Sequence, residues 1–567
     1  MENSILNLIT KIIKETGPYK NIKIFHSNIK IDILSGIMVS IIVLPLALAF
    51  GEISQLGPKA GILGAVIGGI VGGLFGGCVV GVSGPTAPMA SQIALFMSAF
   101  VIGTTNKPDL TAAFSIIFLS GLILILISFL KISKFINYIP YPVIAGFMCG
   151  IGIIVTLSQI NPFFGIEIEK NIYNVFRDFS YTIQNINYQT LYVSIPCLLI
   201  LFLWEFIVIK FKSVKNIPSS LIILIIGTSI AYSMNLEIPY IGDKMNIENN
   251  SSIFQFYLPD FSRFVEFLLP ASLLAGLAII DSLLTCKIAD NITGVRHNSD
   301  REAFSQGVTN MTSGIFGGIS TATATTQTVG NIKFGAKTSL SSIINGIILL
   351  GILLGLSNFL SLIPNVCLAT ILFKLGFDIL DYRILHILKK IPAYDLFIFI
   401  VVLFITVYKN LMFAVGIGIL LSVIKSFPEI VAVFKKNSKH KIYNIKNLNV
   451  DLSNEDKNKL IEFSPVILNL EGPLFFGTTE RIIKIYNNSQ KHKILIIDMK
   501  KVTKVDLSGL YCLDDLVKRA IQNKIKVYIS NTKNSIAHLI NEINILRGCS
   551  LDKSNKEIFT SIINNRN

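Results

Sequence analysis

Long apolar runs, broken by charges, Gly-Pro clusters and polar loops, fill the chain between residues 33 and 427. A helix that crosses the hydrocarbon core of a bilayer needs about 20 mostly apolar residues. Dividing the chain at the interruptions predicts about fourteen membrane segments, some of them short or broken. They cover residues 33–53, 59–77, 84–102, 111–130, 141–160, 189–209, 218–235, 265–289, 301–317, 321–332, 338–357, 361–379, 394–410 and 411–427.

After Phe427 the pattern changes to alternating strand-like and helix-like stretches, which is typical of a small α/β domain. Strands are predicted at Val466–Leu470, Ile494–Met499 and Ile525–Ser530, and helices at 479–489, 508–523 and 535–546. The predicted organisation is a cytoplasmic segment at 1–30, a transmembrane domain at 31–430, a linker at 431–447 and the α/β domain at 448–567.

The charge distribution adds an orientation to this picture. The chain is 51% apolar, and its 50 Lys and Arg against 35 Asp and Glu give a formal net charge of +15. The basic residues gather in loops after every second predicted segment from the fourth to the twelfth. This follows the positive-inside rule and predicts a multi-pass protein of the cell membrane with both termini in the cytoplasm. The excess charge therefore indicates orientation and contact with anionic lipid, and no nucleic-acid partner is expected.

Three further features exclude other classes of protein. The first long apolar run starts near Ile33, after several lysines, so no secretory signal is expected. The seven cysteines form no C-x-x-C pair and lie mostly in apolar runs, which predicts small core residues. The six histidines show no ligand-like spacing, so neither a transition-metal centre nor a tightly bound cofactor is expected.

Two Gly-rich stretches, Gly81–Met89 and Gly317–Thr325, each lead into a short apolar segment. Non-helical backbone at membrane depth occurs only where protein or a water-filled cavity covers its polar groups. Two such interruptions, seven segments apart, indicate an inverted repeat with a binding site between them. If the two helix N-termini converge, their free N–H groups and positive dipole ends bind an anion without a basic side chain. The alternative is that the small residues only permit close helix packing.

One carboxylate lies deep in an apolar segment. Asp281 follows Ala275–Ile280, and a charged group at this depth costs about 2.5–3.5 kcal/mol, which makes it a candidate functional residue. Thr285 is four residues further on and lies on the same helix face. A carboxylate, a hydroxyl and helix-end carbonyls suit a sodium ion. A proton on Asp281, or a buried acid satisfied by its neighbours, are the alternatives. Glu205, beside the only tryptophan, has no assigned partner.

Several motifs in order along nearly the whole chain resemble the sulfate permease family with a C-terminal STAS domain. The resemblance implies a helical membrane domain with a seven-plus-seven inverted repeat, divided into core and gate bundles. It also implies an elevator-like alternating-access movement and, commonly, a homodimer. The motifs are Pro45–Phe50, Val82–Met89, Ile139–Ile151, Ile280–Asp290, Thr293–Asn298, Gln306–Gly318 and Asn331–Thr338.

The chain departs from the sulfate-type pattern of this family at three positions. Sulfate-type members usually carry Gln where this chain has Leu46, Arg where it has Gln327, and Glu where it has Asp281. Losing the Arg removes the positive charge that would compensate a bound anion, so another group must supply that charge. A sodium ion held by Asp281 and Thr285 is one candidate.

The same departures resemble the sodium-dependent bicarbonate branch of the family. The resemblance implies an anion site lined by Leu46, Pro85, Thr86, Ala87 and Ala324. It implies a sodium site made by Asp281, Thr285, Thr325 and the carbonyl of Thr323. In the STAS part, Val502–Leu510 resembles the loop and helix start in which some soluble relatives are phosphorylated, at the position of Ser508. The alternative there is that Asp506 and Ser508 simply cap a helix at Gly509.

The sequence therefore predicts a secondary transporter of small inorganic anions, most consistent with sodium-coupled bicarbonate symport. Proton-coupled transport of sulfate or a dicarboxylate is the first alternative. An anion channel, or a sensor whose STAS domain relays occupancy to a cytoplasmic partner, is an alternative of another class. No P-loop, metal set or nucleophile constellation points to an enzyme.

Overall fold

The chain folds into two units, which the computed structural model describes over residues 16–102, 107–133, 138–166, 179–211, 217–245, 255–408, 411–436, 440–444, 465–487, 492–543, 546 and 554–564. The first unit consists of Met1–Ile136, Met148–Leu380 and Thr406–Met412. The second consists of Asn137–Phe147, Asp381–Ile405 and Phe413–Asn567. The side chain of Glu205 and parts of the predicted linker and STAS domain lie outside the described residues.

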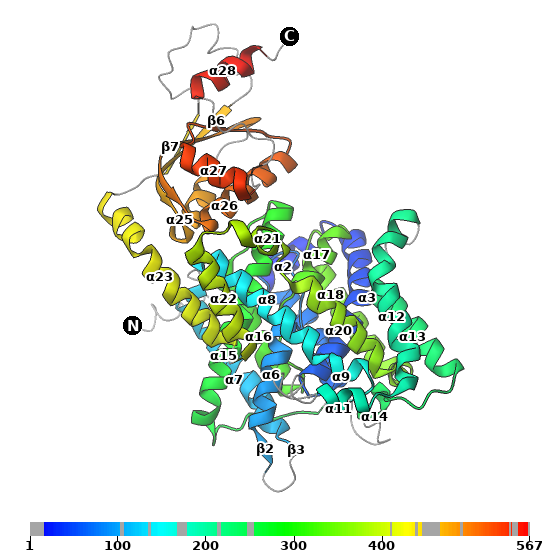
Figure 1. Ribbon diagram of the computed structural model, residues 1–567. Helices are drawn as coiled ribbons and strands as arrows, with labels where there is room; N and C mark the ends of the chain where they lie inside the picture. The colour runs from blue at the N-terminus through cyan, green and yellow to red at the C-terminus, as the bar shows by residue number, and fades with distance from the viewer. Residues whose placement is uncertain are drawn as a thin grey trace. The chain divides into compact units, whose positions relative to one another are not determined.

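The first unit is almost entirely helical (Figure 1). Each membrane segment predicted within it contains a helix. Its helices are α2 (Tyr19–Phe25), α3 (Ile29–Ile53), α4 (Pro58–Ile67), the π-helix η1 (Gly68–Gly72), α5 (Gly73–Phe75), α6 (Ala87–Ala99), α7 (Leu110–Phe129), α9 (Ile160–Phe163), α11 (Phe179–Gln184), α12 (Tyr188–Lys210), α13 (Ser219–Ser233), α14 (Ile241–Met245), α15 (Phe264–Thr293), α16 (Ser299–Ile315), α17 (Thr325–Lys333), α18 (Leu340–Gly355), α19 (Ser357–Ser361) and α20 (Asn365–Ile379).

Local signals in the sequence set the ends of the central helices. The side chain of Asp109 accepts a hydrogen bond from Ala112 N and begins α7, and that of Asn298 accepts one from Arg301 N and begins α16. Both are N-cap residues of the expected type. Helix α15 ends at Gly294, whose φ of +76° is the left-handed conformation that glycine adopts without strain.

Small residues let the helices of the first unit pack closely. A Cβ added to Gly121 of α7 would lie 2.5 Å from the carbonyl oxygen of Gly307 on α16. A Cβ on Gly314 would lie 2.7 Å from the carbonyl oxygen of Phe114 on α7. The glycines therefore bring α7 and α16 into close contact, as small residues do between helices in membranes.

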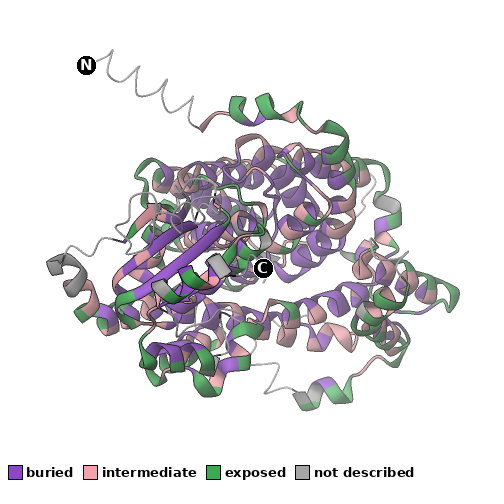
Figure 2. Cartoon of the chain, turned by 90° about the horizontal axis from the view of Figure 1, so that it is seen from above, coloured by how far each residue is buried: buried purple, intermediate pink, exposed green. Residues whose placement is uncertain are grey.

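Several helices carry large apolar side chains on their outer faces, seen as exposed stretches in Figure 2. On α12, Phe206 is 70% exposed and Ile209 is 75% exposed. Apolar patches of this kind mark surfaces that face lipid or a partner. By length and composition, six of the described helices can cross a membrane, and shorter apolar helices accompany them. Helices α16 and α17 are more polar, since they line the interior described below.

The second unit combines membrane helices with a four-stranded sheet. Its strand order is β5 (Lys441–Asn444), β6 (Pro465–Leu474), β7 (Ile494–Val505) and β8 (Lys526–Ser530). Strand β5 is antiparallel to β6, whereas β6, β7 and β8 are parallel. The other elements are α21 (Tyr382–Ile387), η4 (Leu388–Lys390), α22 (Ala393–Tyr408), α23 (Leu411–Lys436), α25 (Phe476–Asn487), α26 (Leu507–Gln522), α27 (Asn534–Ile543) and α28 (Asn555–Asn564), and the first part of α8 (Tyr141–Ser158) also belongs here.

The three predicted strands and three predicted helices of the α/β domain are present with small shifts of their ends. The first half of β7 is buried throughout, as expected of a central parallel strand (Figure 2). One element differs from the prediction. Residues 441–444, which the sequence placed in a linker, form β5 at the edge of the sheet, and residues 431–436 continue α23. A short polar edge strand carries too weak an apolar alternation to be recognised.

Candidate functional site

Two short strands join the Gly-rich stretches inside the first unit. Strand β1 (Ser83–Gly84) pairs antiparallel with β4 (Ala322–Thr323), with Ser83 opposite Thr323 and Gly84 opposite Ala322. The pairing continues outward, because Ala324 N donates to Val82 O at 3.0 Å. Each strand leads directly into a short helix, α6 after β1 and α17 after β4. The two helix starts are therefore held together, which is the condition under which they can form an anion site.

The first turns of both helices lack side-chain caps. Thr86 and Ala324 precede α6 and α17 in extended conformations, and neither side chain accepts a hydrogen bond from its helix. Pro88 occupies the first turn of α6, where its missing N–H costs nothing. Helices of 13 and 9 residues with uncapped N–H groups present a positive partial charge at their starts. Such ends suit an anion.

Helix α15 supplies polar side chains to both elements. The backbone N–H of Thr323 donates to the Ser282 hydroxyl at 3.0 Å. The hydroxyls of Thr285 and Thr325 lie 2.6 Å apart. Asp281 lies one turn before Thr285, and its carboxyl is within interaction range of the Thr86 side chain. Three parts of the fold thus meet here. Helix α15 supplies Asp281 and Thr285, β4 and α17 supply Thr323 and Thr325, and the start of α6 supplies Thr86.

Buried polar atoms around this site have no hydrogen-bond partner among the described residues. They are Asp281 Oδ2 and Gln327 Oε1. Leaving a buried polar atom unsatisfied costs about 1–3 kcal/mol, and buried polar groups in folded proteins are otherwise nearly always bonded. The arrangement therefore calls for a bound ion, ligand or water that completes these groups.

The predicted anion-lining residues are small or apolar. Ala87 and Ala324 flank the two helix starts and are 3% and 5% exposed. Pro85 is buried, and its carbonyl oxygen accepts a long hydrogen bond of 3.5 Å from Gln327 Nε2. Leu46 is buried on α3, a helix that contacts α6. The side chain of Gln327 packs over Gly84, so a neutral amide lies beside β1.

A buried acid that the sequence analysis did not single out joins the two half-helix elements. Glu302 of α16 is 2% exposed. Its Oε2 accepts hydrogen bonds from Gly77 N at 2.8 Å and Cys78 N at 3.0 Å, just before β1. Its Oε1 accepts from the Thr323 hydroxyl of β4 and from Gln306 Nε2. In the sequence, Glu302 stands beside Arg301 at the start of an amphipathic segment. Charged residues at the end of a membrane segment are ordinary, so Glu302 did not stand out.

Glycines in the π-helix let β1 approach. A Cβ on Gly68 would lie 2.5 Å from the Ser83 carbonyl oxygen, and one on Gly72 would lie 2.6 Å from the Ser83 hydroxyl. Real Cβ atoms essentially never show such distances. The π-helix η1 thus positions β1, in keeping with the frequent use of π-helical turns at functional sites.

The second unit places Ser508 at a junction rather than at a helix cap. Asp506 caps α26 by accepting from Gly509 N at 2.7 Å, as predicted. The Ser508 hydroxyl accepts from Tyr141 N at 3.0 Å, at the start of α8. Tyr141 donates its own hydroxyl to Asp381 and lies 4.2 Å from the ring of Tyr511. Burial raises the pKa of the Asp506 carboxyl to about 7, and the nearby charge of Asp395 acts in the same direction.

Residues 29–402 match the sulfate permease family, and residues 457–561 match the STAS domain. The chain belongs to the sulfate permease family. A bicarbonate transporter of this kind, BicA of Picosynechococcus sp., is 31% identical over 538 residues, which cover 94% of each protein. BicA of Synechocystis sp. is 32% identical over 530 residues, which cover 93% of this chain and 92% of that protein. The putative sulfate transporter YvdB of Bacillus subtilis is 27% identical over 522 residues, or 90% and 93% of the two chains.

Two solved structures share this fold. The transmembrane domain of a cyanobacterial BicA superimposes with a TM-score of 0.61 at 34% identity and covers 69% of this chain and 98% of its own. SLC26A9 superimposes with a TM-score of 0.65 at 18% identity and covers 100% and 95%, which shows the shared fold. The protein is therefore a multi-pass membrane anion transporter of the sulfate permease family with a C-terminal STAS domain, and not an enzyme.

Proposed function

We propose that the protein couples the movement of sodium to the uptake of a small inorganic anion, with bicarbonate as the preferred anion. The observation that carries the proposal is the set of unpartnered buried polar atoms at the paired starts of α6 and α17. The resemblance to proteins named bicarbonate transporters over more than 90% of the chain supports the choice of anion.

The anion occupies the space in front of the two uncapped helix starts. It is surrounded by Pro85, Thr86, Ala87 and Ala324. Leu46 lines the apolar side of the space. The backbone N–H groups and the Thr86 hydroxyl donate hydrogen bonds, so no basic side chain is needed. This suits a small, singly charged oxyanion, because helix ends contribute only about half an elementary charge each.

The sodium ion lies between Asp281, the hydroxyls of Thr285 and Thr325, and the carbonyl of Thr323. These are hard oxygen ligands from α15, β4 and α17. The 2.6 Å distance between the two hydroxyl oxygens supports a shared site for them. Asp281 contributes the single negative charge, with Oδ2 unpartnered in the described structure.

Electrostatics explains why the two ions bind together. Two like unit charges about 6 Å apart repel by roughly 3 kcal/mol at an effective dielectric constant of about 20, so the Asp281 carboxylate alone opposes an anion bound nearby. Sodium between them reverses the sign of the local field, so each ion raises the affinity for the other. In sulfate-type relatives an arginine supplies the positive charge beside the anion. Here Gln327 is neutral at that position, so the sodium ion supplies the charge.

One sodium ion with one bicarbonate moves no net charge, so the membrane potential of about 2.3 kcal/mol per charge per 100 mV does not oppose uptake. One sodium ion with sulfate carries net negative charge into a negative interior and needs further cations. The electroneutral pair is therefore the favoured cargo.

The antiparallel pairing of β1 and β4 supports an inverted repeat, because a two-fold axis in the membrane plane relates two such strands in this way. In the proposed mechanism α6, α15 and α17 move with their ions as one body against a gate bundle, in an elevator-like alternating-access cycle. The protein acts as a homodimer, both termini and the STAS domain face the cytoplasm, and the STAS domain binds a cytoplasmic partner or is modified at Ser508.

Uptake of labelled bicarbonate into proteoliposomes tests the proposal. Wild-type uptake should require an inward sodium gradient, and Asp281→Asn should abolish the sodium dependence together with most of the uptake. Asp378→Asn is the matched control, because this residue is an exposed acid on α20 paired with Lys374. Uptake driven by a pH gradient without sodium would favour proton coupling instead. Currents that reverse at the anion equilibrium potential would indicate a channel.

A further inference from the structure

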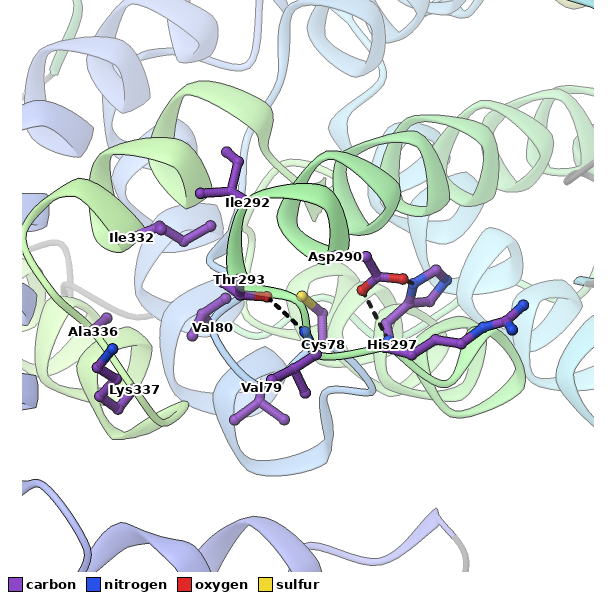
Figure 3. A pocket seen from close by; sticks show the side chains of 12 residues that line it. Cys78, Val79, Val80, Asp290, Ile292, Thr293, His297, Ile332, Ala336 and Lys337 are labelled. Carbon is purple, nitrogen blue, oxygen red and sulfur yellow. Dashed lines mark hydrogen bonds and ion pairs between the residues drawn. The ribbon is translucent and has the colours of Figure 1, made fainter. Parts of the chain in front are cut away.

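A cavity of about 250 Å³ lies in the first unit away from the paired helix starts (Figure 3). Three segments form its walls. They are the turn before β1 at 78–80, the end of α15 with the loop that follows at 290–297, and the end of α17 with its loop at 332–337. Asp281 and Asp290 are nine residues apart on α15, so the cavity lies about 14 Å along the helix from the sodium-site acid.

Two of the motifs that carry the family resemblance meet at this cavity. Thr293–Asn298 supplies Thr293, Arg296 and His297, and Asn331–Thr338 supplies Ile332 and Lys337. The proposed anion and sodium sites use no residue of either motif. The charge pattern of the sequence predicts that both loops face the cytoplasm.

Hydrogen bonds fix the walls in place. Asp290 accepts from His297 N at 2.9 Å and contacts the His297 ring Nδ1 at 2.8 Å, which holds the loop against the end of α15 (Figure 3). On the facing wall, Asp32 of α3 accepts from Lys337 N at 2.8 Å and from Thr338 N at 3.2 Å. The backbone around both basic residues is therefore preorganised.

The groups that line the cavity suit an oxyanion. The Lys337 side chain is exposed and makes no ion pair or hydrogen bond within the described part of the chain. Arg296 adds a second cation from the opposite loop. The turn is closed by a hydrogen bond from Gly81 N to Cys78 O at 3.1 Å, and the N–H groups of its central residues Val79 and Val80 have no partner among the described residues. Guanidinium, ammonium and turn N–H groups are the usual donors to phosphate.

The volume of the cavity and its apolar residues limit which ligands can bind. Pockets for drug-sized ligands are about 300–1,000 Å³, and this cavity is smaller. Val80, Ile292 and Ile332 make one part of its surface apolar. A phosphomonoester or a phospholipid headgroup matches this combination, whereas a nucleotide is too large.

We propose that the cavity is a regulatory site for a phosphate-type oxyanion. A phosphate bound between Lys337, Arg296 and the 78–80 turn ties the segment that leads into β1 to the loop that leaves α17. Because α6, α15 and α17 move as one body in the proposed cycle, this bridge acts inside that body. It fixes the spacing of the two half-helix elements that carry the transport site and so slows the release of the transported ions.

Binding of inorganic phosphate and of glycerol 3-phosphate to the purified full-length protein in detergent tests the site without relying on transport. Both probes should raise the melting temperature of wild-type protein, and Lys337→Gln should weaken binding at least about tenfold, the loss of roughly one charge-assisted contact of about 1.5–3 kcal/mol. Lys333→Gln is the matched control, since Lys333 is an exposed lysine at the end of α17 that does not line the cavity. Equal binding to both variants would overturn the proposal, and so would a failure of both probes and of anionic lipid to bind.

Melting temperatures measured in lipid nanodiscs distinguish a lipid headgroup from a soluble phosphate ester as the occupant of the cavity. If the occupant is a lipid headgroup, phosphatidylglycerol nanodiscs should raise the melting temperature over phosphatidylcholine nanodiscs in wild type and Lys333→Gln but not in Lys337→Gln. If it is a soluble ester, only the free compounds should do so.

Sodium-driven uptake should fall about fivefold or more on occupancy in wild type, within the range of allosteric coupling, and remain unchanged in Lys337→Gln. If phosphate still binds at this cavity but anion uptake does not depend on sodium, the proposed sodium coupling is refuted and the phosphate site is not.

Discussion

Replacing Glu302 by Gln tests whether the buried acid holds the two half-helix elements together. Its carboxylate accepts hydrogen bonds from Gly77 N, Cys78 N, Gln306 Nε2 and the Thr323 hydroxyl. Glutamine has the same shape but only one acceptor oxygen. If that oxygen keeps Gly77 N and Cys78 N, its NH2 group faces the Thr323 hydroxyl, which can turn to accept, and Gln306 Nε2, which loses its acceptor. An unsatisfied buried donor costs about 1–3 kcal/mol, and this is the expected loss of stability.

The assay is thermal unfolding of purified full-length protein in detergent at a fixed scan rate, together with sodium-driven uptake. One kcal/mol shifts the midpoint by about 2–4 °C in a domain of 150–250 residues and by less in a larger one. Glu302→Gln should therefore melt roughly 2–5 °C below wild type and transport poorly. Glu266→Gln is the control, because Glu266 is 58% exposed in a surface pair with Arg263. A Glu302→Gln protein that melts and transports like wild type would refute the reasoning.

Three further substitutions test other parts of the account. Thr285→Val removes a proposed sodium ligand at nearly constant volume and should raise the half-saturating sodium concentration about tenfold; an unchanged sodium titration would contradict this role. Gly68→Ala should abolish uptake, because its Cβ would lie 2.5 Å from the Ser83 carbonyl oxygen, whereas Gly351→Ala, with no atom within 4 Å, should be silent. The pKa of the Asp506 carboxyl is about 7 in the folded protein, above its ordinary value of 3.8. Its contribution to stability is therefore lost as the pH rises through 7, so the wild-type melting temperature should fall between pH 6 and pH 8, and Asp506→Asn, which keeps the cap acceptor, should flatten that fall.

The sequence signals that pointed to the candidate site are strong and local. Prolines and glycines in Gly81–Met89 cannot continue a membrane helix, and the structure shows an extended strand followed by a short helix there. Asp281 was recognised because a carboxylate inside an apolar run is costly. The sequence left open whether the two elements converge, and the pairing of β1 with β4 brings them together.

The features that the sequence missed depend on contacts between distant segments. Glu302 reads as a polar residue at a helix start, and only the fold shows that its partners are Gly77, Cys78 and Thr323. The partner of Ser508, the backbone of Tyr141, lies 367 residues away in the chain. Strand β5 is visible only through its pairing with β6, because four residues of mixed polarity give no periodic signal.

The central claim is that helix ends and a coupled cation hold the anion in place of an arginine. The most direct test is calorimetric titration of bicarbonate into purified wild-type protein without sodium and at saturating sodium. The account predicts that sodium lowers the bicarbonate dissociation constant at least about fivefold, in line with coupling free energies of about 1–3 kcal/mol. Equal dissociation constants in the two conditions would contradict it.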